Sequence, residues 1–242
     1  MGWYKHWFGT PWYALLYGHR DENEANAWVE ALIGKWGDAS GWEVLDMACG
    51  RGRHARGFAA VGAKVTGIDI SIESIEAARK AVPEAEFQVH DMREPFAVSR
   101  FDAAYCLFTS LGYFDDLNDD RKVFAAAFTA LKPGGRFVVD FMNSPLVIAS
   151  LVPEEKVTRE GVEFNIARTV EEDRIIKRIM VRSGGSEYEF EEKVQALLPE
   201  QLMELATDTG FEIVDRTDGP QPSPFDPDRS QRFVLWMKKP IG

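Results

Sequence analysis

One stretch of the sequence combines acidic residues with closely spaced glycines: VLDMACGRGRHARGFAAVGAKVTGIDIS, residues 44–71. An apolar run leads into Gly50 and Gly52, a helical segment follows, and a second apolar run ends at Asp69. In a strand–helix–strand unit, such a glycine loop lets a ligand approach the backbone, and the acid accepts hydrogen bonds from a ribose diol. The spacing therefore predicts a site for an adenosine-containing cofactor.

Asp46 distinguishes between two kinds of adenosine cofactor. Gly50, Gly52 and Ala55 also fit the looser dinucleotide-binding fingerprint, so an NAD-dependent enzyme is one alternative. Asp46 lies four residues before Gly50, where it would repel the pyrophosphate of a dinucleotide. The same carboxylate would attract a positively charged ligand, such as the ammonium and sulfonium groups of S-adenosylmethionine. An acid that only caps a turn is the other interpretation of Asp46.

The N-terminal segment WYKHWFGTPWYALLYGHR, residues 3–20, is rich in aromatic residues. The GTP sequence at residues 9–11 is expected to divide it into two short helices. Because rings beside a sulfonium attract it and exclude water, we expect Tyr13 and Tyr17 to face the cofactor. The other rings are expected mainly to pack on or cover the domain, namely Trp3, Trp7 and Phe8. Packing alone is the alternative for most of these rings, and the low basic charge disfavours a membrane-surface helix.

Predicted strands and helices alternate over the first two thirds of the chain. The strands are short apolar runs at residues 43–48, 64–70, 85–90, 101–108 and 136–142. The helices are predicted between them at residues 53–61, 71–81 and 117–131, with Ser71 as an N-cap. This alternation predicts a parallel sheet with helices on both faces.

The pattern changes in the last third. Residues 157–198 alternate apolar and polar side chains and predict about three antiparallel strands. A helix then begins at Pro199 and ends at Gly210. Two further strands, at residues 211–216 and 232–238, are expected to close the sheet as a hairpin.

Together these segments resemble the class I S-adenosylmethionine-dependent methyltransferases over nearly the whole chain. The motifs are VLDMACGRG, GIDIS, VHDMREPF, FDAAYCLFTSLGYF, LKPGGRFVVDF, LPEQLMELATDTGFEIVDR and RFVLWMKKP. The resemblance implies an α/β fold: a doubly wound, seven-stranded, mostly parallel sheet with an antiparallel β insertion after strand 5. It also implies S-adenosylmethionine as cofactor and S-adenosylhomocysteine as product.

The resemblance implies a role for each motif residue. Asp46, Ala48 and the glycine loop after them would lie along the methionine portion of the cofactor. Asp69 and Ile70 would hold the ribose and flank the adenine. Asp91 would accept a hydrogen bond from the adenine amino group, and a solvated loop acid is the alternative for it.

A narrower resemblance is to small-molecule N-methyltransferases of the glycine N-methyltransferase and amino-sugar N,N-dimethyltransferase type. It rests on DMACG, CLFTSLGYF, Asn143 after the fifth strand, and the antiparallel insertion. Such enzymes hold tyrosines and an arginine of an N-terminal helix over the cofactor carboxylate, which implies Tyr17 and Arg20 here. A surface arginine is the alternative for Arg20. The wider resemblance also implies Met92 beside the adenine and Leu107 near the cofactor.

Methyl transfer from a sulfonium requires mainly alignment and exclusion of water. Ser110 and Tyr113 after the fourth strand, and His19 in the N-terminal segment, are candidates to assist the acceptor. A turn hydroxyl and a packing ring are the alternatives for the first two. We expect a small-molecule acceptor, more readily at nitrogen than at oxygen, because a neutral amine needs only a weak base or a water. A protein or RNA methyltransferase and a non-catalytic cofactor-binding protein stay open.

The composition of the 242-residue chain restricts the classes of partner that it can bind. A net charge of −11 disfavours nucleic acid, and no apolar run approaches the length of a membrane span. The two cysteines, Cys49 and Cys106, are expected to be buried and free, which favours a cytoplasmic protein. The four histidines lack metal-ligand spacing and are expected to be satisfied or exposed, so no metal is predicted.

We expect three parts: N-terminal lid helices at residues 1–36, the cofactor-binding domain at residues 37–150 and 199–242, and an antiparallel insertion at residues 151–198. The insertion would roof the substrate or form a dimer interface, so the protein is expected to be a monomer or a homodimer.

Overall fold

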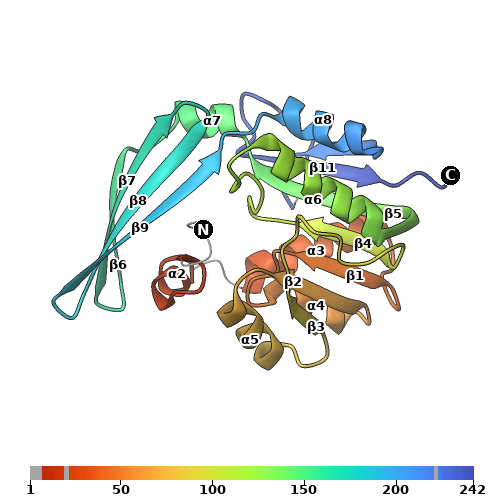
Figure 1. Cartoon of the computed structure of the whole chain (residues 1–242), viewed down its shortest axis with the longest axis horizontal. Coiled ribbons are helices and arrows are strands. Elements are labelled where there is room, and N and C mark those ends of the chain that lie inside the picture. The colour runs from red at the N-terminus through yellow and green to blue at the C-terminus, as the bar shows by residue number, and fades with distance from the viewer. Residues whose placement is uncertain (1–6, 19–21, 221–222) are drawn as a thin grey trace.

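The central layer of the molecule is a seven-stranded sheet with helices on both faces (Figure 1). The computed structural model describes residues 7–18, 22–220 and 223–242. The strand order is β10-β11-β5-β4-β1-β2-β3, in which β11 is antiparallel to both neighbours and the other pairs are parallel. The strands are β1 (Glu43–Met47), β2 (Lys64–Asp69), β3 (Glu86–Val89), β4 (Phe101–Cys106), β5 (Leu131–Met142), β10 (Glu212–Thr217) and β11 (Arg232–Lys238). The predicted doubly wound, mostly parallel sheet with a closing hairpin is confirmed.

Apolar helix faces cover both sides of this sheet. One side is covered by α6 (Leu117–Ala130) and α8 (Pro199–Thr209), and the other by α3 (Glu22–Trp36), α4 (Arg53–Ala60) and α5 (Ile72–Ala81). The central strands are buried on both faces, which explains their near-continuous apolar sequences. The sequence groups α3 with the N-terminal lid, but Trp28 and Leu32 of α3 are buried against α4 and the sheet.

A second sheet has four antiparallel strands in the order β6-β7-β8-β9 and extends to one side of the first (Figure 1). Its strands are β6 (Glu154–Arg159), β7 (Val162–Glu171), β8 (Arg174–Ser183) and β9 (Ser186–Gln195), and α7 (Ser144–Ala149) leads into it from β5. The sequence predicts about three strands here, but the structure adds β6. Its sequence, EEKVTR, lies at the sheet edge and is mostly exposed, so it lacks the alternation that identifies a half-buried strand.

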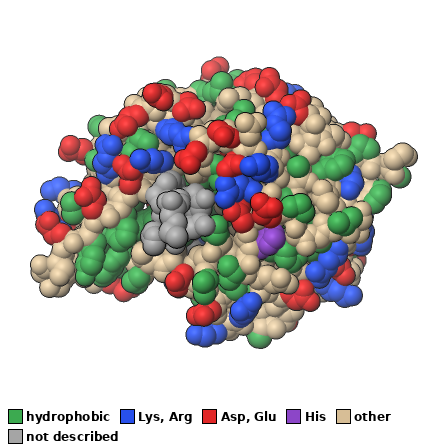
Figure 2. Space-filling view, viewed as in Figure 1, with side chains coloured by type: hydrophobic (Ala, Val, Ile, Leu, Met, Phe, Trp, Pro, Cys, Tyr) green, Lys and Arg blue, Asp and Glu red, His purple; other side chains and the backbone are tan. Residues whose placement is uncertain are grey.

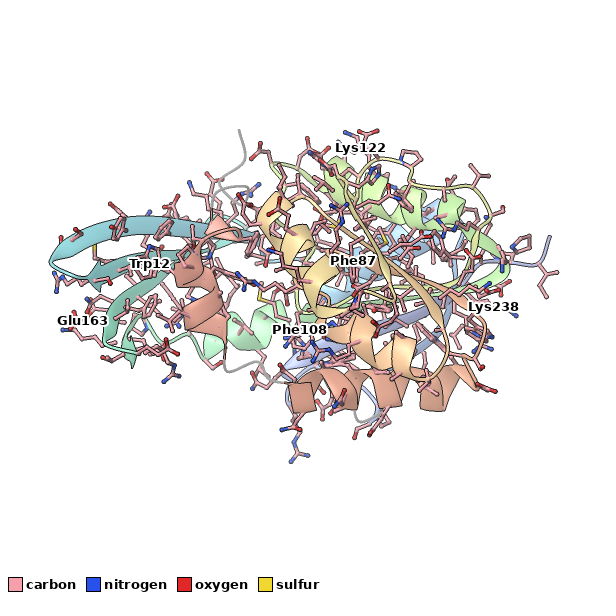
Figure 3. All side chains as sticks on the ribbon, turned by 90° about the horizontal axis from the view of Figure 1, so that it is seen from below. Trp12, Phe87, Phe108, Lys122, Glu163 and Lys238 are labelled. Carbon is pink, nitrogen blue, oxygen red and sulfur yellow. The ribbon has the colours of Figure 1, made fainter. Side chains whose placement is uncertain are left out.

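The two faces of the four-stranded sheet differ. One face packs against α2 (Pro11–Tyr17), with Trp7 and Leu16 buried beside Phe164 and Ile179. The Trp12 ring of α2 lies against the same sheet, 5.5 Å from Tyr188 between ring centroids (Figure 3). The opposite face carries paired charges, namely Arg182 with Glu163 and Glu187, and Arg178 with Glu191. The apolar face is therefore occupied by α2, and the charged face meets solvent.

The helices were also compared with the requirements of a membrane-spanning segment. Within the described ranges, no helix has both the length and the apolar character needed to span a membrane.

Candidate functional site

A cavity of about 470 Å³ lies between the carboxyl edge of the seven-stranded sheet and α2. This edge is where open α/β sheets bind ligands, and the volume is typical of small-molecule sites. Most of the predicted site residues line it: Tyr13, Tyr17, Asp46, Ala48, Gly50, Asp69, Ile70, Asp91, Met92, Leu107, Ser110 and Tyr113. Residues far apart in the sequence therefore converge on one cavity.

Three predicted residues do not appear among those lining the cavity. Gly52 precedes α4 with a positive φ of 78°, and a Cβ there would lie 2.9 Å from Phe87 Cζ. Backbone conformation and packing therefore both require glycine at this position, and its contact with a cofactor stays a prediction. His19 and Arg20 lie outside the described residues.

Among the described residues, no group of His, Cys, Asp or Glu side chains could hold a metal ion.

Asp69 ties the glycine loop to the end of β2. Its Oδ2 accepts a hydrogen bond from Gly50 N at 2.9 Å, and its Oδ1 accepts one from Ser71 N at 2.8 Å. Burial raises the pKa of Asp69, and the backbone N–H groups of Ser71 and Gly50 partly oppose that rise. The loop before it is tightly turned, because Ala48 has a φ of 57° and Gly50 one of 54°. The carboxylate is thus fixed in place with further lone pairs available to a ligand.

Asp46 and Asp91 stand at the ends of the neighbouring strands. The Asp46 carboxyl is 2% exposed, and its Oδ2 has no hydrogen-bond partner among the described residues. Burial is the main cause that raises the pKa of Asp46 to about 8, and the charge of Asp69 adds to it. Asp91 is half-buried and pairs with Arg93, whose Nη2 lies 2.6 Å from Asp91 Oδ2. Three acids from β1, β2 and the end of β3 therefore face the same cavity.

The loop after β4 has a strained backbone. Phe108 and Thr109 have φ values of 60° and 59°, in the left-handed region that such residues rarely adopt. Phe108 N donates to Asp140 Oδ2 at 2.7 Å, and Arg232 pairs with the same carboxylate. Strain of this kind gathers at functional sites, and here it places the Phe108 ring at the cavity, between the two sheets in Figure 3. The residue types gave no signal for this conformation.

Ser110 belongs to the same loop. Its hydroxyl donates to the carbonyl oxygen of Leu107 at 2.8 Å, so it has the turn-forming role that was the alternative for it. It nevertheless lines the cavity, where its oxygen can accept a further hydrogen bond.

Aromatic rings cover the cavity from the side of α2. Ring centroids lie 4.8 Å apart for Tyr13 and Tyr17, 4.9 Å for Phe8 and Tyr13, and 5.3 Å for Phe8 and Tyr113. Phe8 lines the cavity with Tyr13 and Tyr17, whereas Trp7 is buried against Phe190. Tyr13, Tyr17 and Trp7 thus lie where they were expected, whereas Phe8, which was expected to pack on or cover the domain, lines the cavity. Trp3 lies outside the described residues.

The Tyr17 hydroxyl points to the second sheet. It donates to Glu192 of β9, 2.8 Å from Oε1, and accepts a hydrogen bond from Lys177 of β8. Trp7 Nε1 donates to the same Glu192 at 2.6 Å. Glu192 and Lys177 therefore hold the segment that covers the cavity, and sequence patterns alone could not pair them with it.

His54 is a cavity residue that sequence reasoning missed. It is 6% exposed, its ring stacks on Phe108 at 5.3 Å, and its Nε2 has no hydrogen-bond partner among the described residues. Burial, and secondarily the charge of Arg53, lower the pKa of His54 to about 3. The expectation that each histidine is satisfied or exposed is therefore wrong for His54. Its position in the first turn of α4, directly after the glycine loop, was the available signal.

Comparisons with known proteins agree with this geometry. Residues 44–135 match a family model described as a methyltransferase domain. A dTDP-3-amino-3,4,6-trideoxy-alpha-D-glucopyranose N,N-dimethyltransferase of Streptomyces venezuelae is 29% identical over 153 residues, 62% of this chain and 64% of that protein. A dTDP-4-amino-2,3,4,6-tetradeoxy-D-glucose N,N-dimethyltransferase of Saccharopolyspora spinosa is 35% identical over 97 residues, 40% of this chain and 39% of that protein. The matches thus span less than two thirds of these curated relatives.

Solved structures share the whole fold. An S-adenosylmethionine-dependent methyltransferase from Clostridium acetobutylicum ATCC 824 superposes with a TM-score of 0.81 at 20% identity, over 94% of this chain and 95% of that one. At this identity the likeness concerns the fold, and it includes the second sheet because nearly the whole chain is covered.

Proposed function

We propose that this chain, which has the fold and the methyltransferase domain of the class I S-adenosylmethionine-dependent methyltransferases, transfers a methyl group to the nitrogen of a small-molecule amine. The observation that carries the proposal is one cavity with three acids on its sheet side and aromatic rings on its α2 side. The relatives named as amino-sugar N,N-dimethyltransferases support an amine acceptor.

The residues present fit S-adenosylmethionine. The unpartnered Oδ2 of Asp46 suits a cationic group, and the fixed carboxylate of Asp69 suits a ribose diol. Asp91 and Met92 would hold the adenine, and Ile70 and Leu107 would line its surroundings. When bound, S-adenosylmethionine supplies a methyl group activated by a positively charged sulfur.

The protein's own contribution is alignment and exclusion of water. Phe8, Tyr13, Tyr17 and Tyr113 would surround the sulfonium and the acceptor nitrogen with ring faces and edges. The Ser110 oxygen is oriented by its hydrogen bond to Leu107. It would accept a hydrogen bond from the N–H of the substrate amine and so direct the lone pair of the nitrogen toward the methyl group. A water hydrogen-bonded to the Tyr113 hydroxyl would then receive the proton lost from nitrogen, and His19 is a further candidate outside the described residues.

The second sheet and α2 would act together as a roof over the acceptor. The apolar face of that sheet is covered by α2, and its other face is charged. Because the described residues leave no apolar face of this sheet for a second copy, this arrangement favours the role of a roof and disfavours that of a dimer interface. Figure 2 shows acidic and basic side chains interspersed over one face of the molecule, without the continuous basic surface that nucleic acid requires. The two free, buried cysteines support a cytoplasmic location.

A transfer assay tests the proposal. The protein is incubated with S-adenosylmethionine carrying a labelled methyl group and with separate panels of amines, amino sugars, carboxylic acids, peptides and RNA. We expect label on an amine or amino sugar and none with an Asp69→Ala control. Label on peptide or RNA alone would establish one of the other transfer functions, and cofactor binding without transfer to any panel would favour a non-catalytic binding protein.

A further inference from the structure

The loop between β4 and α6 brings the Tyr113 ring to the cavity. The residue before the ring, Gly112, is bound from two sides. Its N–H donates to Asp120 Oδ1 of α6 at 2.8 Å, and its carbonyl oxygen accepts a hydrogen bond from the backbone N–H of Gln195, the last residue of β9, at 2.7 Å. Gly112 has a φ of 77°, and a Cβ there would lie 3.2 Å from the carbonyl oxygen of Gln195. Glycine therefore suits both the conformation and the close approach.

The residue after the ring, Phe114, is held by the base of the second sheet. Its carbonyl oxygen accepts hydrogen bonds from Gln195 Nε2 at 3.1 Å and from Arg174 Nη1 at 3.0 Å. Arg174 Nη2 donates to the next carbonyl oxygen, that of Asp115, at 2.6 Å. Arg174 and Gln195 face each other across β8 and β9, so one cross-strand pair binds the loop. The backbone is thus fixed on both sides of Tyr113 by residues outside its loop.

A buried hydrogen bond joins α6 to the second sheet at the same place. Gln195 Nε2 donates to Asp120 Oδ2 at 2.9 Å, and the two residues are 3% and 0% exposed. Burial raises the pKa of Asp120 to about 6, and the hydrogen bonds from Gly112 and Gln195 oppose the rise. The side chain is therefore mostly ionised at neutral pH, and each of its oxygens accepts a hydrogen bond. A buried carboxylate contributes little net stability, but here it fixes α6, β9 and the loop relative to one another.

We propose that Asp120, Gln195 and Arg174 are positioning residues for methyl transfer. They hold the backbone around Tyr113 so that its ring and hydroxyl meet the acceptor nitrogen in the alignment that transfer requires. The second sheet thereby sets the position of an acceptor residue in addition to covering the cavity. This inference rests on the proposed transfer to an amine, and the experiment below separates the two.

The test compares transfer kinetics with cofactor binding. Asp120→Asn keeps the shape of the side chain but replaces one accepting oxygen with a donor, so one of its two hydrogen bonds is lost. Arg174→Met removes both hydrogen bonds from a side chain that is 22% exposed, and it decides the question if Asp120→Asn does not fold. The values of kcat and KM are measured with the panel amine that the wild-type protein methylates fastest. Calorimetry measures the affinity for S-adenosylmethionine.

Asp120→Asn should lower kcat by about 10- to 100-fold, because a displacement of about 1 Å at the reacting groups has an effect of this size. The KM for the amine and the affinity for S-adenosylmethionine should each change by less than about threefold, since the variant leaves the cofactor residues in place. Arg174→Met should show the same separation of kcat from binding, with a smaller, several-fold loss.

Thr217→Val is the matched control. It also removes a buried hydrogen bond, the one that Trp236 Nε1 donates to Thr217 Oγ1 at 2.8 Å, but between β10 and β11. Neither residue lines the cavity. The control should lower the melting temperature and leave kcat unchanged. A loss of kcat in Thr217→Val as large as in Asp120→Asn would mean that the rate follows the stability of the fold.

A double-mutant cycle shows whether Asp120 acts through Tyr113. In a Tyr113→Ala background, Asp120→Asn should lower kcat by less than about twofold, because the ring that it positions is already gone. Losses that multiply in the double variant would overturn the inference, and so would a loss of cofactor affinity as large as the loss of kcat. Wild-type kcat in both Asp120→Asn and Arg174→Met would overturn it while leaving the proposed function intact. If the wild-type protein methylates no amine, the proposed function fails and this inference fails with it.

Discussion

The floor of the cavity, formed by Asp46, Asp69 and Asp91 at the sheet edge, differs from its roof, formed by α2 and the second sheet. On the floor, Asp46 is buried and its Oδ2 lacks a partner among the described residues. In the roof, Lys177 and Glu192 are also shielded, with 14% and 13% of their side chains exposed, yet they pair with each other at 3.7 Å. The charges of Lys177 and Glu192 thus satisfy each other, whereas one buried carboxyl oxygen of the floor has no protein partner among the described residues.

This difference separates binding from stability. A buried polar group without a protein partner lowers the stability of the free protein, and it can raise the affinity for a ligand that pairs with it. Functional sites commonly lower stability in this way. Changes to the floor should therefore act mainly on affinity. Changes to the roof should act on how long a ligand stays enclosed and on the stability of the roof itself.

Asp69→Ala should produce the largest loss of affinity. The carboxylate would bind the ribose diol, and it also holds Gly50 N and thereby the glycine loop. Two hydrogen bonds to a charged group are lost together, so S-adenosylmethionine should bind at least about 100-fold more weakly by calorimetry. Unchanged binding would remove Asp69 from the site and with it the proposed floor.

Asp102 offers a matched control for Asp69. It also accepts a hydrogen bond from a backbone N–H, that of Glu43 at 2.9 Å, but it does so at the opposite end of the sheet. Asp102→Ala should lower the melting temperature and leave the affinity for S-adenosylmethionine unchanged. A comparable loss of affinity in both variants would show that binding simply follows the stability of the sheet.

The pH dependence of binding tests Asp46. Because its pKa in the ligand-free protein is raised to about 8, Asp46 is mostly protonated at neutral pH and must lose a proton to meet a cation. Affinity for S-adenosylmethionine should therefore rise by up to about tenfold per pH unit between about pH 6 and pH 7.5. Asp46→Asn should abolish most of this slope. A flat profile for the wild type would mean that Asp46 faces no positive charge.

The stability of the ligand-free protein depends on pH in the opposite direction to the affinity. Since the native state holds a proton on Asp46 that the unfolded chain releases near pH 3.8, this group lowers the stability as pH rises from about 4 to 8. The titratable groups around Asp46 include Asp69, Arg53, Tyr105, Cys49, Cys106 and His54. The pKa of His54 is lowered to about 3, so His54 stays neutral across the window and does not produce the slope.

The floor was largely predictable from the sequence. Asp46, Gly50 and Asp69 are close along the chain, and a strand–loop–helix–strand unit brings them together almost whatever surrounds it. Gly52 shows the limit of this reasoning, because its small size is needed against Phe87 of a third strand. His54 shows it again. Its ring stacks on Phe108, whose backbone N–H donates to Asp140 of β5, so this contact involves a strand far away in the sequence.

The roof was predictable only in part. Alternation of apolar and polar residues indicated the second sheet, and the aromatic residues of the N-terminal segment led to the expectation that Tyr13 and Tyr17 face the cofactor. The partner of Tyr17, however, is Glu192, 175 positions away. A glutamate in a charged strand carries no local signal that it will face inward, so this contact arises from tertiary packing alone.

The smallest expected effect concerns the attachment of the roof. Tyr17→Phe keeps the ring at the cavity and removes the hydroxyl that joins α2 to Glu192 and Lys177. One net hydrogen bond is lost, so S-adenosylmethionine should dissociate roughly 2- to 10-fold faster, as measured by stopped-flow tryptophan fluorescence with Trp7 as a nearby reporter. Tyr17→Ala, which also removes the ring, should have a larger effect without unfolding the domain, and Tyr188→Phe on the same sheet should have none. A loss from Tyr17→Phe as large as that from Asp69→Ala would contradict the division of roles, because the roof would then bind the ligand as directly as the floor does.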